Sequence, residues 1–405
     1  MRHLLSALLF TLPLAAWAQT TPLTEAEAVR RGLARPDLAD LEVGRVESAK
    51  AEATAAGMPP NPTLGYTRDR KGGAPDSTEE TWQLSQTFDL SGRRGLRREA
   101  AESRVEAAYA GNNLRRGELA AEIRHRFHEA LFKQEAVLVT ETWVQRFSRV
   151  ERIVDKLARA GEASGYDRRR LARERQTAEA RLSNERADLD RASERLAALL
   201  GTSGKAVESV TGVLRPTVPA PLDSALSRLE RRPDLQALAR RAEAADLEGR
   251  AASRGWVPDV TLGFGPKRID NGITRENGSV ISVSIPLPVF DRQQAGQQRA
   301  AAEALNARGE LSFARARAEG DLRGLHRQVE RLVAASADYR TRAVGESAEL
   351  LRIAEAAYQG GESTLLELLD AYRGALEAEM TALDLEWKAR QARIDYDLLT
   401  GSVTE

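Results

Sequence analysis

The sequence predicts a mainly α-helical protein with a small β part, built as two similar halves. All 15 prolines lie at or before Pro75, between Pro216 and Pro266, or at Pro286 and Pro288. Since proline breaks helix interiors, the two long proline-free tracts between and after them can form helices. Apolar residues recur within these tracts at helical spacing, and short motifs recur at an offset of about 200 residues.

Composition excludes several classes of protein. The 405 residues carry 60 Lys+Arg and 60 Asp+Glu, so the chain lacks the basic footprint of a nucleic-acid binder. With no Cys, it can form no disulfide, thiolate metal site or N-terminal lipidated cysteine. No catalytic triad, phosphate loop or metalloprotease motif is present, so we predict no enzyme activity and no cofactor. His125 and His128 are spaced like a metal pair, but we assign no metal site to them.

Residues 1–18 have the pattern of a secretory signal peptide. Arg2 precedes an apolar stretch that ends in small residues at Ala16 and Ala18. The stretch is too short to span a membrane as a helix, and Pro13 interrupts it. We therefore expect an exported protein.

Two structural repeats follow the signal peptide. ARPDLADL from Ala34 matches RRPDLQAL from Arg231, and GEAS from Gly161 matches GEST from Gly361. Glycine at these last two positions predicts a bend between two helices. The predicted segments are a first repeat at 19–201 (strands 62–70 and 79–90, helical hairpin 93–200), a linker at 202–222, a second repeat at 223–401 (strands 258–268 and 279–288, hairpin 292–400) and a tail at 402–405.

Helix lengths suggest a long wall of helices. Residues 93–159 would form about 100 Å of helix at 1.5 Å per residue. Residues 25–57 and 167–200 together have the same length. The second half nearly repeats this relation, with a predicted long helix at 292–358 and shorter helices at 223–256 and 365–400. A long helix flanked by two half-length helices in line suits a tube better than a globular core.

The predicted strands alternate apolar residues with Gly, Ser and Thr. Trp82, Leu84 and Phe88 alternate with polar neighbours over a length typical of a transmembrane barrel strand. A half-buried soluble sheet would show the same pattern. Four strands cannot close a membrane barrel, because an open edge in lipid leaves backbone groups unsatisfied. Either the strands lie outside a membrane, or several chains share one barrel; three chains would supply twelve strands.

Two junction motifs carry a family resemblance. They add to the signal peptide, the duplicated strand pairs and the paired helices, which together resemble the TolC-like outer-membrane factors. More narrowly, TWQLSQTFDLSGRRGLR from Thr81 and ISVSIPLPVFDRQQAG from Ile281 resemble the CzcC-like branch of heavy-metal efflux. The resemblance implies a homotrimer with a twelve-stranded β-barrel in the outer membrane, continued by an α-helical barrel in the periplasm. It also implies a periplasmic adaptor (membrane fusion protein), an inner-membrane RND pump and outer-membrane lipids as partners. The implied function is a passive conduit for heavy-metal cations.

The resemblance further implies roles for the two helix bends. GESTLLELLDA from Gly361 is similar to the family's tip motif with acidic gate residues. The implied gate residues are Glu367, Asp370 and Asp167. The implied adaptor-docking tips are Gly161, Glu162, Ser164, Gly361, Glu362 and Thr364. The alternative is local turn chemistry, in which acids favour a helix start and Gly, Ser and Thr cap adjoining helices.

Three other functions remain open at this point. An outer-membrane duct for drug efflux or for type I protein secretion would have the same tube architecture. A secreted coiled-coil periplasmic adaptor would lack a pore. Such adaptors usually have one helical hairpin, whereas this chain has two.

Overall fold

A computed structural model describes residues 22–73, 76–161, 163–202, 204 and 207–401. The predicted signal peptide and tail therefore lie outside the described residues. The chain divides into two compact units: unit 1 (Met1–Ala28 and Arg126–Leu214) and unit 2 (Val29–His125 and Arg215–Glu405). Helix α3 (Arg93–Ala160) contributes to both units.

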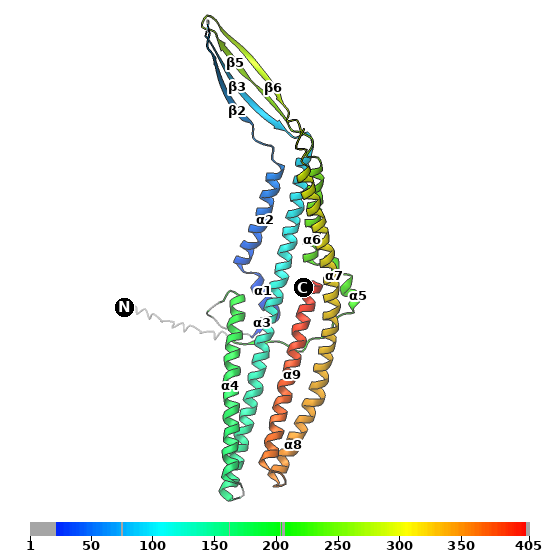
Figure 1. Cartoon of the computed structure of the whole chain (residues 1–405). Helices are drawn as coiled ribbons and strands as arrows, with labels where there is room; N and C mark the ends of the chain where they lie inside the picture. Colours follow the sequence, from blue (N-terminus) through cyan, green and yellow to red (C-terminus); the bar gives the residue numbers. More distant parts are fainter. Residues whose placement is uncertain (1–21, 74–75, 162, 203, 205–206, 402–405) are drawn as a thin grey trace, which may run out of the picture. The chain divides into compact units, whose positions relative to one another are not determined.

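Unit 1 is a helical hairpin with a small parallel ladder. The second part of α3 packs antiparallel against α4 (Gly165–Leu199), since Arg175 reaches Glu151 at 2.7 Å and Lys133 reaches Asp188 at 2.7 Å (Figure 1). The buried side chains include Trp143, Phe127 and Leu171. Strand β1 (Leu23–Thr24) pairs with β4 (Val210–Thr211).

Three of the described helices of unit 2 pack along α7 (Gln294–Tyr339). Its buried Leu322, Val329 and Val333 contact α9 (Leu365–Thr400) and the short helix α5 (Leu222–Leu226). Arg308 of α7 pairs with Asp246 of α6 (Pro233–Ser253) at 2.7 Å. The remaining helices of this unit are α2 (Pro36–Gly57), α8 (Gly345–Gln359), the 3-10 turn η1 (Leu229–Arg231), the π-helical turn η2 (Arg340–Val344) and most of α1 (Glu25–Leu33).

One antiparallel sheet of four strands joins the strand pairs of both halves of the sequence. The order is β2 (Thr63–Lys71), β3 (Ser77–Phe88), β5 (Val260–Asp270) and β6 (Arg275–Ser284) (Figure 1).

The strand β6 ends earlier than the sequence predicts. We expected a strand at 279–288, but β6 ends at Ser284 and begins at Arg275, because the β5–β6 turn is tighter than the predicted loop. Pro286 and Pro288 lack the N–H needed to continue a ladder. The segment after Ser284 is therefore irregular and leads into α7.

Two predicted helices are broken by proline. Residues 25–57 form α1 and α2 rather than one helix, and residues 223–256 form α5, η1 and α6. Pro36 and Pro233 each stand at the first position of a new helix, where their missing N–H costs nothing, and the residues before them are extended. The predicted match in length between one long helix and two shorter ones is therefore wrong, because two of the shorter helices are divided into separate pieces.

The second long helix contains a π-helical turn. We expected uninterrupted helix over 292–358, but η2 separates α7 from α8. Arg340 in this turn donates two hydrogen bonds to the Glu386 carboxylate of α9, at 3.0 and 2.9 Å. Among the described residues, no helix is both long and apolar enough to cross a membrane.

Candidate functional site

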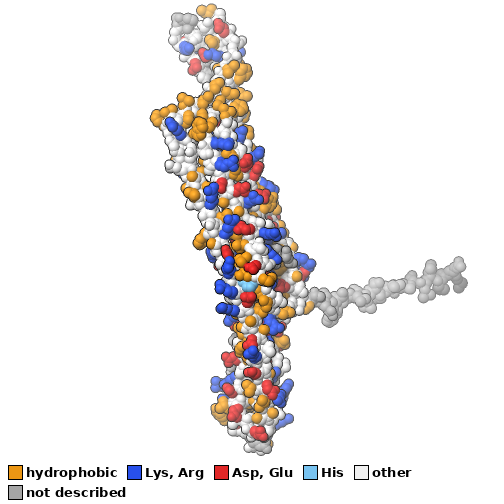
Figure 2. Space-filling model, turned by 90° about the vertical axis from the view of Figure 1, so that its right-hand side faces the viewer, with side chains coloured by type: hydrophobic (Ala, Val, Ile, Leu, Met, Phe, Trp, Pro, Cys, Tyr) orange, Lys and Arg blue, Asp and Glu red, His pale blue; other side chains and the backbone are white. Residues whose placement is uncertain are grey.

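One face of the four-stranded sheet is a continuous apolar surface. Leu64, Leu84, Phe264 and Ile281 are register partners across all four strands and are 68%, 56%, 63% and 77% exposed. In Figure 2, hydrophobic side chains gather at the strand end of unit 2, whereas charged side chains are spread over the helices. A surface of this kind requires an apolar environment such as a lipid bilayer or a partner protein.

The opposite face carries small and polar side chains. The Gln83 amide donates to the Ser282 hydroxyl, and the Thr87 and Thr261 hydroxyls are hydrogen-bonded at 2.8 Å. Gly265 has to be glycine, because a Cβ there would lie 1.8 Å from the Trp82 carbonyl oxygen. The two faces therefore differ as the lipid and water faces of a barrel strand differ.

The sheet has two open edges. In the described chain, β2 pairs only with β3, and β6 pairs only with β5. Unpaired edge groups invite pairing with another strand, and in lipid they cost several kcal/mol each. The sheet is thus incomplete as a membrane structure on its own.

The tip of the second hairpin is built from local hydrogen bonds. Gly361 has φ +72°, and its N–H donates to the Tyr358 carbonyl at 3.2 Å while the Glu362 N–H donates to the Ala357 carbonyl at 2.8 Å. This Schellman arrangement ends α8. Thr364 then caps α9, as the Glu367 N–H donates to its Oγ1 at 3.3 Å.

The tip of the first hairpin repeats this chemistry. Gly161 has φ +82° and follows the end of α3. Ser164 caps α4, with the Asp167 N–H donating to its Oγ at 3.1 Å. Glu162, the remaining predicted tip residue, lies outside the described residues.

The three predicted gate acids differ in how their carboxylates are engaged. Glu367 accepts from the Thr364 N–H at 2.8 Å and from its hydroxyl at 3.1 Å. Asp167 accepts from the Ser164 hydroxyl at 2.7 Å in the same way. Asp370 is exposed and makes no hydrogen bond or ion pair with another described residue. Of the three predicted gate acids, Asp370 is therefore the one whose carboxylate accepts no hydrogen bond from a described residue of the turn.

The two neighbouring histidines of α3 have separate partners. His125 Nε2 lies 2.8 Å from Asp395, and the buried His128 Nε2 lies 3.0 Å from Glu25. Within the part of the chain that the structure describes, no three His, Asp or Glu side chains form a group that could hold a metal ion. These contacts fit structural roles.

The comparison with known families decides the identification. The model of the outer membrane efflux protein family matches residues 33–202 and 227–402. The chain belongs to this family. Membership confirms the resemblance drawn from the junction motifs, and it places the protein in the outer membrane as an efflux component. Efflux proteins of this family transport rather than catalyse, as expected for a chain without catalytic motifs.

Individual relatives agree with the family. The cobalt-zinc-cadmium resistance protein CzcC of Cupriavidus metallidurans is 29% identical over 328 residues, covering 79% of this chain and 77% of CzcC. The nickel-cobalt-cadmium resistance protein NccC of Alcaligenes xylosoxydans xylosoxydans is 24% identical over 316 residues, 74% of this chain and 69% of NccC. The crystal structure of the outer membrane protein VceC of Vibrio cholerae superposes with a TM-score of 0.79 at 20% identity, over 94% of this chain and 97% of VceC. At 20% identity, the similarity to VceC shows the fold alone.

Proposed function

We propose that three copies of this chain form the outer-membrane channel of a tripartite RND-type efflux system. The observation that carries the proposal is the sheet with one apolar face, one polar face and two open edges. Three copies joined edge to edge, β6 to β2, would satisfy the edge groups and close a twelve-stranded barrel with its polar face toward the lumen. The helices would continue this barrel into the periplasm, and the two halves of each chain would be copies of one duplicated unit.

Heavy-metal cations are the cargo we propose. CzcC and NccC, the relatives described above, are named for resistance to cobalt, zinc, nickel and cadmium. A conduit does not need a tight metal site, since tight binding would slow release. The RND pump would supply the energy, and the channel would be passive.

The acids at the hairpin tips would form a periplasmic gate. Threefold symmetry would turn Glu367, Asp370 and Asp167 each into a ring of three carboxylates, which would favour cations in a narrow aperture. Glu367→Gln combined with Asp370→Asn should lower the cation preference in single-channel recordings. Unchanged selectivity would contradict this gate.

The hairpin tips would also dock the periplasmic adaptor. Gly161, Ser164, Gly361 and Thr364 shape the backbone of the two bends, and Glu162 and Glu362 are acids beside them. The same residues can cap a helix and bind an adaptor. The capping hydrogen bonds point toward the helix and leave the outer surface of the bend free for a partner.

Native mass spectrometry of protein extracted from purified outer membranes would test the shared barrel. We expect three chains per particle. A monomer recovered from the soluble periplasm would contradict the proposal, because one chain cannot close the barrel, and it would favour the adaptor-like alternative.

A further inference from the structure

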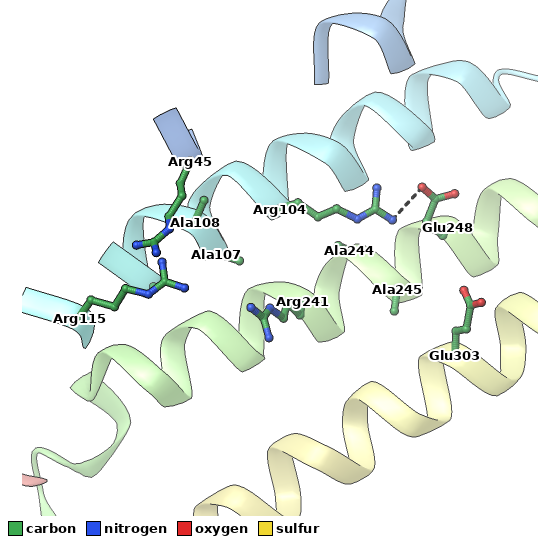
Figure 3. Close-up of a pocket in the computed structure, with 11 residues that line it drawn as sticks. Arg45, Arg104, Ala107, Ala108, Arg115, Arg241, Ala244, Ala245, Glu248 and Glu303 are labelled. Carbon is green, nitrogen blue, oxygen red and sulfur yellow. Dashed lines mark hydrogen bonds and ion pairs between the residues drawn. The ribbon is translucent and has the colours of Figure 1, made fainter. Parts of the chain in front are cut away.

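A groove lined by arginines lies among helices α2, α3, α6 and α7 of unit 2. Its volume is about 550 Å³, and small residues such as Ala107, Gly111 and Ala244 form much of its wall. Figure 3 shows side chains that reach it from each of these helices. The charged residues are Arg45 of α2, Arg104 and Arg115 of α3, Arg241 and Glu248 of α6, and Glu303 of α7.

Arginines next to the groove are paired with acids. Arg104 donates to Glu248 at 3.1 Å at one end of the groove. On the same helices, Arg116 lies 2.8 Å from Glu42, and Arg240 donates to Glu243 at 2.9 Å. The Arg240 guanidinium lowers the pKa of Glu243, so this pair is ionised at neutral pH. Each of these three arginines thus has a carboxylate partner.

Three other arginines of the groove have no such carboxylate partner among the described residues. Arg45, Arg115 and Arg241 make no hydrogen bond or ion pair with any described residue. In Figure 3, Arg45 and Arg115 extend toward one another with Arg241 nearby, whereas Glu248 and Glu303 lie toward the other end. Like charges brought together repel, so this arrangement is favourable when an anion lies among them.

We propose that this arginine end of the groove binds a multiply charged oxyanion of the phosphate type. Guanidinium groups bind phosphate oxygens with two parallel hydrogen bonds, and several such groups on different helices can surround one anion. The small residues of the wall leave room for a group larger than a single phosphate. This site is independent of the cargo proposed above, because positively charged arginines bind anions and would repel metal cations.

Isothermal titration calorimetry on the detergent-purified full-length protein tests the site, with inorganic phosphate and pyrophosphate as probes. Arg45→Gln, Arg115→Gln and Arg241→Gln together should weaken binding by about tenfold or more, since each removes a charge-assisted hydrogen bond. Pyrophosphate should bind more tightly than phosphate.

A matched control removes the same charge elsewhere. Arg250, Arg299 and Arg331 are exposed on α6 and α7 and lie outside the groove. Their triple change to Gln should leave the dissociation constant within about twofold of the unchanged protein. An equal loss in both triple variants would overturn the proposal, because it would show attraction to overall charge rather than to a site.

A second pair of variants avoids removing three side chains at once. Gly111 lines the groove, and a Cβ there would meet no atom within 4 Å. Gly111→Glu would place a carboxylate beside the arginines and compete with the anion, whereas Gly111→Gln has the same size without the charge. We expect binding to be lost in the Glu variant and retained in the Gln variant. Equal behaviour of the two would overturn the proposal.

The anion could be free in solution or part of a lipid headgroup. Native mass spectrometry from nanodiscs of phosphatidylglycerol, compared with phosphatidylcholine, distinguishes the sources. Binding of pyrophosphate in detergent that needs the three arginines supports a free anion. Arginine-dependent retention of phosphatidylglycerol without pyrophosphate binding supports a lipid. Absence of both overturns the site.

Discussion

The two hairpin tips share a backbone design but not a charge. Each has a glycine with positive φ after the first helix and a hydroxyl that caps the second, Ser164 in unit 1 and Thr364 in unit 2. The first turns of α9 carry Glu367 and Asp370. The first turns of α4 carry Asp167 at the position of Glu367, but the acid at 370 is replaced by Arg170 within a run of arginines, Arg168, Arg169, Arg170 and Arg173.

The two tips also differ in how the capped helix is anchored. Leu368, Leu369 and Tyr372 at the start of α9 are at most 2% exposed, and the Tyr372 hydroxyl donates to Glu355 of α8 at 2.5 Å. Full burial of each leucine contributes about 2 kcal/mol. The matching positions of α4 are Arg168, Arg169 and Ala172, and the fully buried Leu171 anchors that helix instead. Turn chemistry is thus common to both hairpins, and any difference in function must come from the charges and side chains around it.

The largest expected effect is on docking. Gly361→Glu should abolish pull-down of the partner adaptor while leaving the trimer intact in native mass spectrometry, because a bulky charge would stand on the outer surface of the bend. Gly361→Ala imposes the same strain of about 1 kcal/mol at a positive φ as Gly361→Glu, but adds only a methyl group. The Ala variant should therefore still bind the adaptor. Loss of binding in the Ala variant would instead indicate a distorted turn. The corresponding Gly161→Glu shows whether the first tip docks equally.

The next largest effect is a difference in cation preference between variants of Asp370 and Glu367, the two acids of the second tip. We expect Asp370→Asn to remove more of the cation preference in single-channel recordings than Glu367→Gln, because the Glu367 carboxylate is hydrogen-bonded to Thr364 and the Asp370 carboxylate is exposed. Gln at position 367 can retain the capping box, so that variant changes charge alone. A larger effect of Glu367→Gln would reverse this assignment.

A smaller effect tests whether the caps are equivalent. Ser164→Ala and Thr364→Ala should each lower the local stability of their hairpin by about 1 kcal/mol, because each removes the acceptor for a helix N–H. Hydrogen exchange of the first turns of α4 and α9 would measure this. Thr364→Ser keeps the hydroxyl and should be nearly neutral. Clearly unequal losses in the two Ala variants would show that surrounding packing, rather than the cap, determines tip stability.

The smallest effect concerns acid sensitivity of the first hairpin. The hydrogen bond from Lys133 lowers the pKa of Asp188, so the folded state binds this proton less readily than the unfolded state. The resulting stability is present above the ordinary Asp pKa of about 3.9 and is lost as the pH falls through the lower folded pKa. For this half-buried pair it amounts to roughly 0.2–1 kcal/mol.

Asp188→Asn should therefore reduce the loss of thermal stability of the detergent-solubilised protein between pH 6 and pH 3. Asp190→Asn removes an acid from the same helix that forms no ion pair with another described residue, and should leave that loss unchanged. Similar curves for both variants would show that the pair with Lys133 adds no measurable stability.

Local rules accounted for much of the fold and for the tips. Glycine followed by Ser or Thr three residues later predicted both bends, because these residues satisfy helix-end groups within a few positions of the sequence. Strand periodicity predicted the alternating faces of β3 and β5. The helix breaks at Pro36 and Pro233 also follow a local rule, because proline can begin a helix but cannot continue one, so the single helices predicted at 25–57 and 223–256 are wrong.

Long-range contacts account for what the sequence could not predict. By itself the sequence determined a mainly helical chain with four amphipathic strands and two capped hairpins, because periodicity, proline and cap residues act over short distances. Only the tertiary structure decided that β3 pairs with β5 across the two halves, that a π-helical turn meets Glu386, and that Arg45, Arg115 and Arg241 share one groove. These features depend on residues far apart in sequence, whose shared position is set by how helices and strands pack.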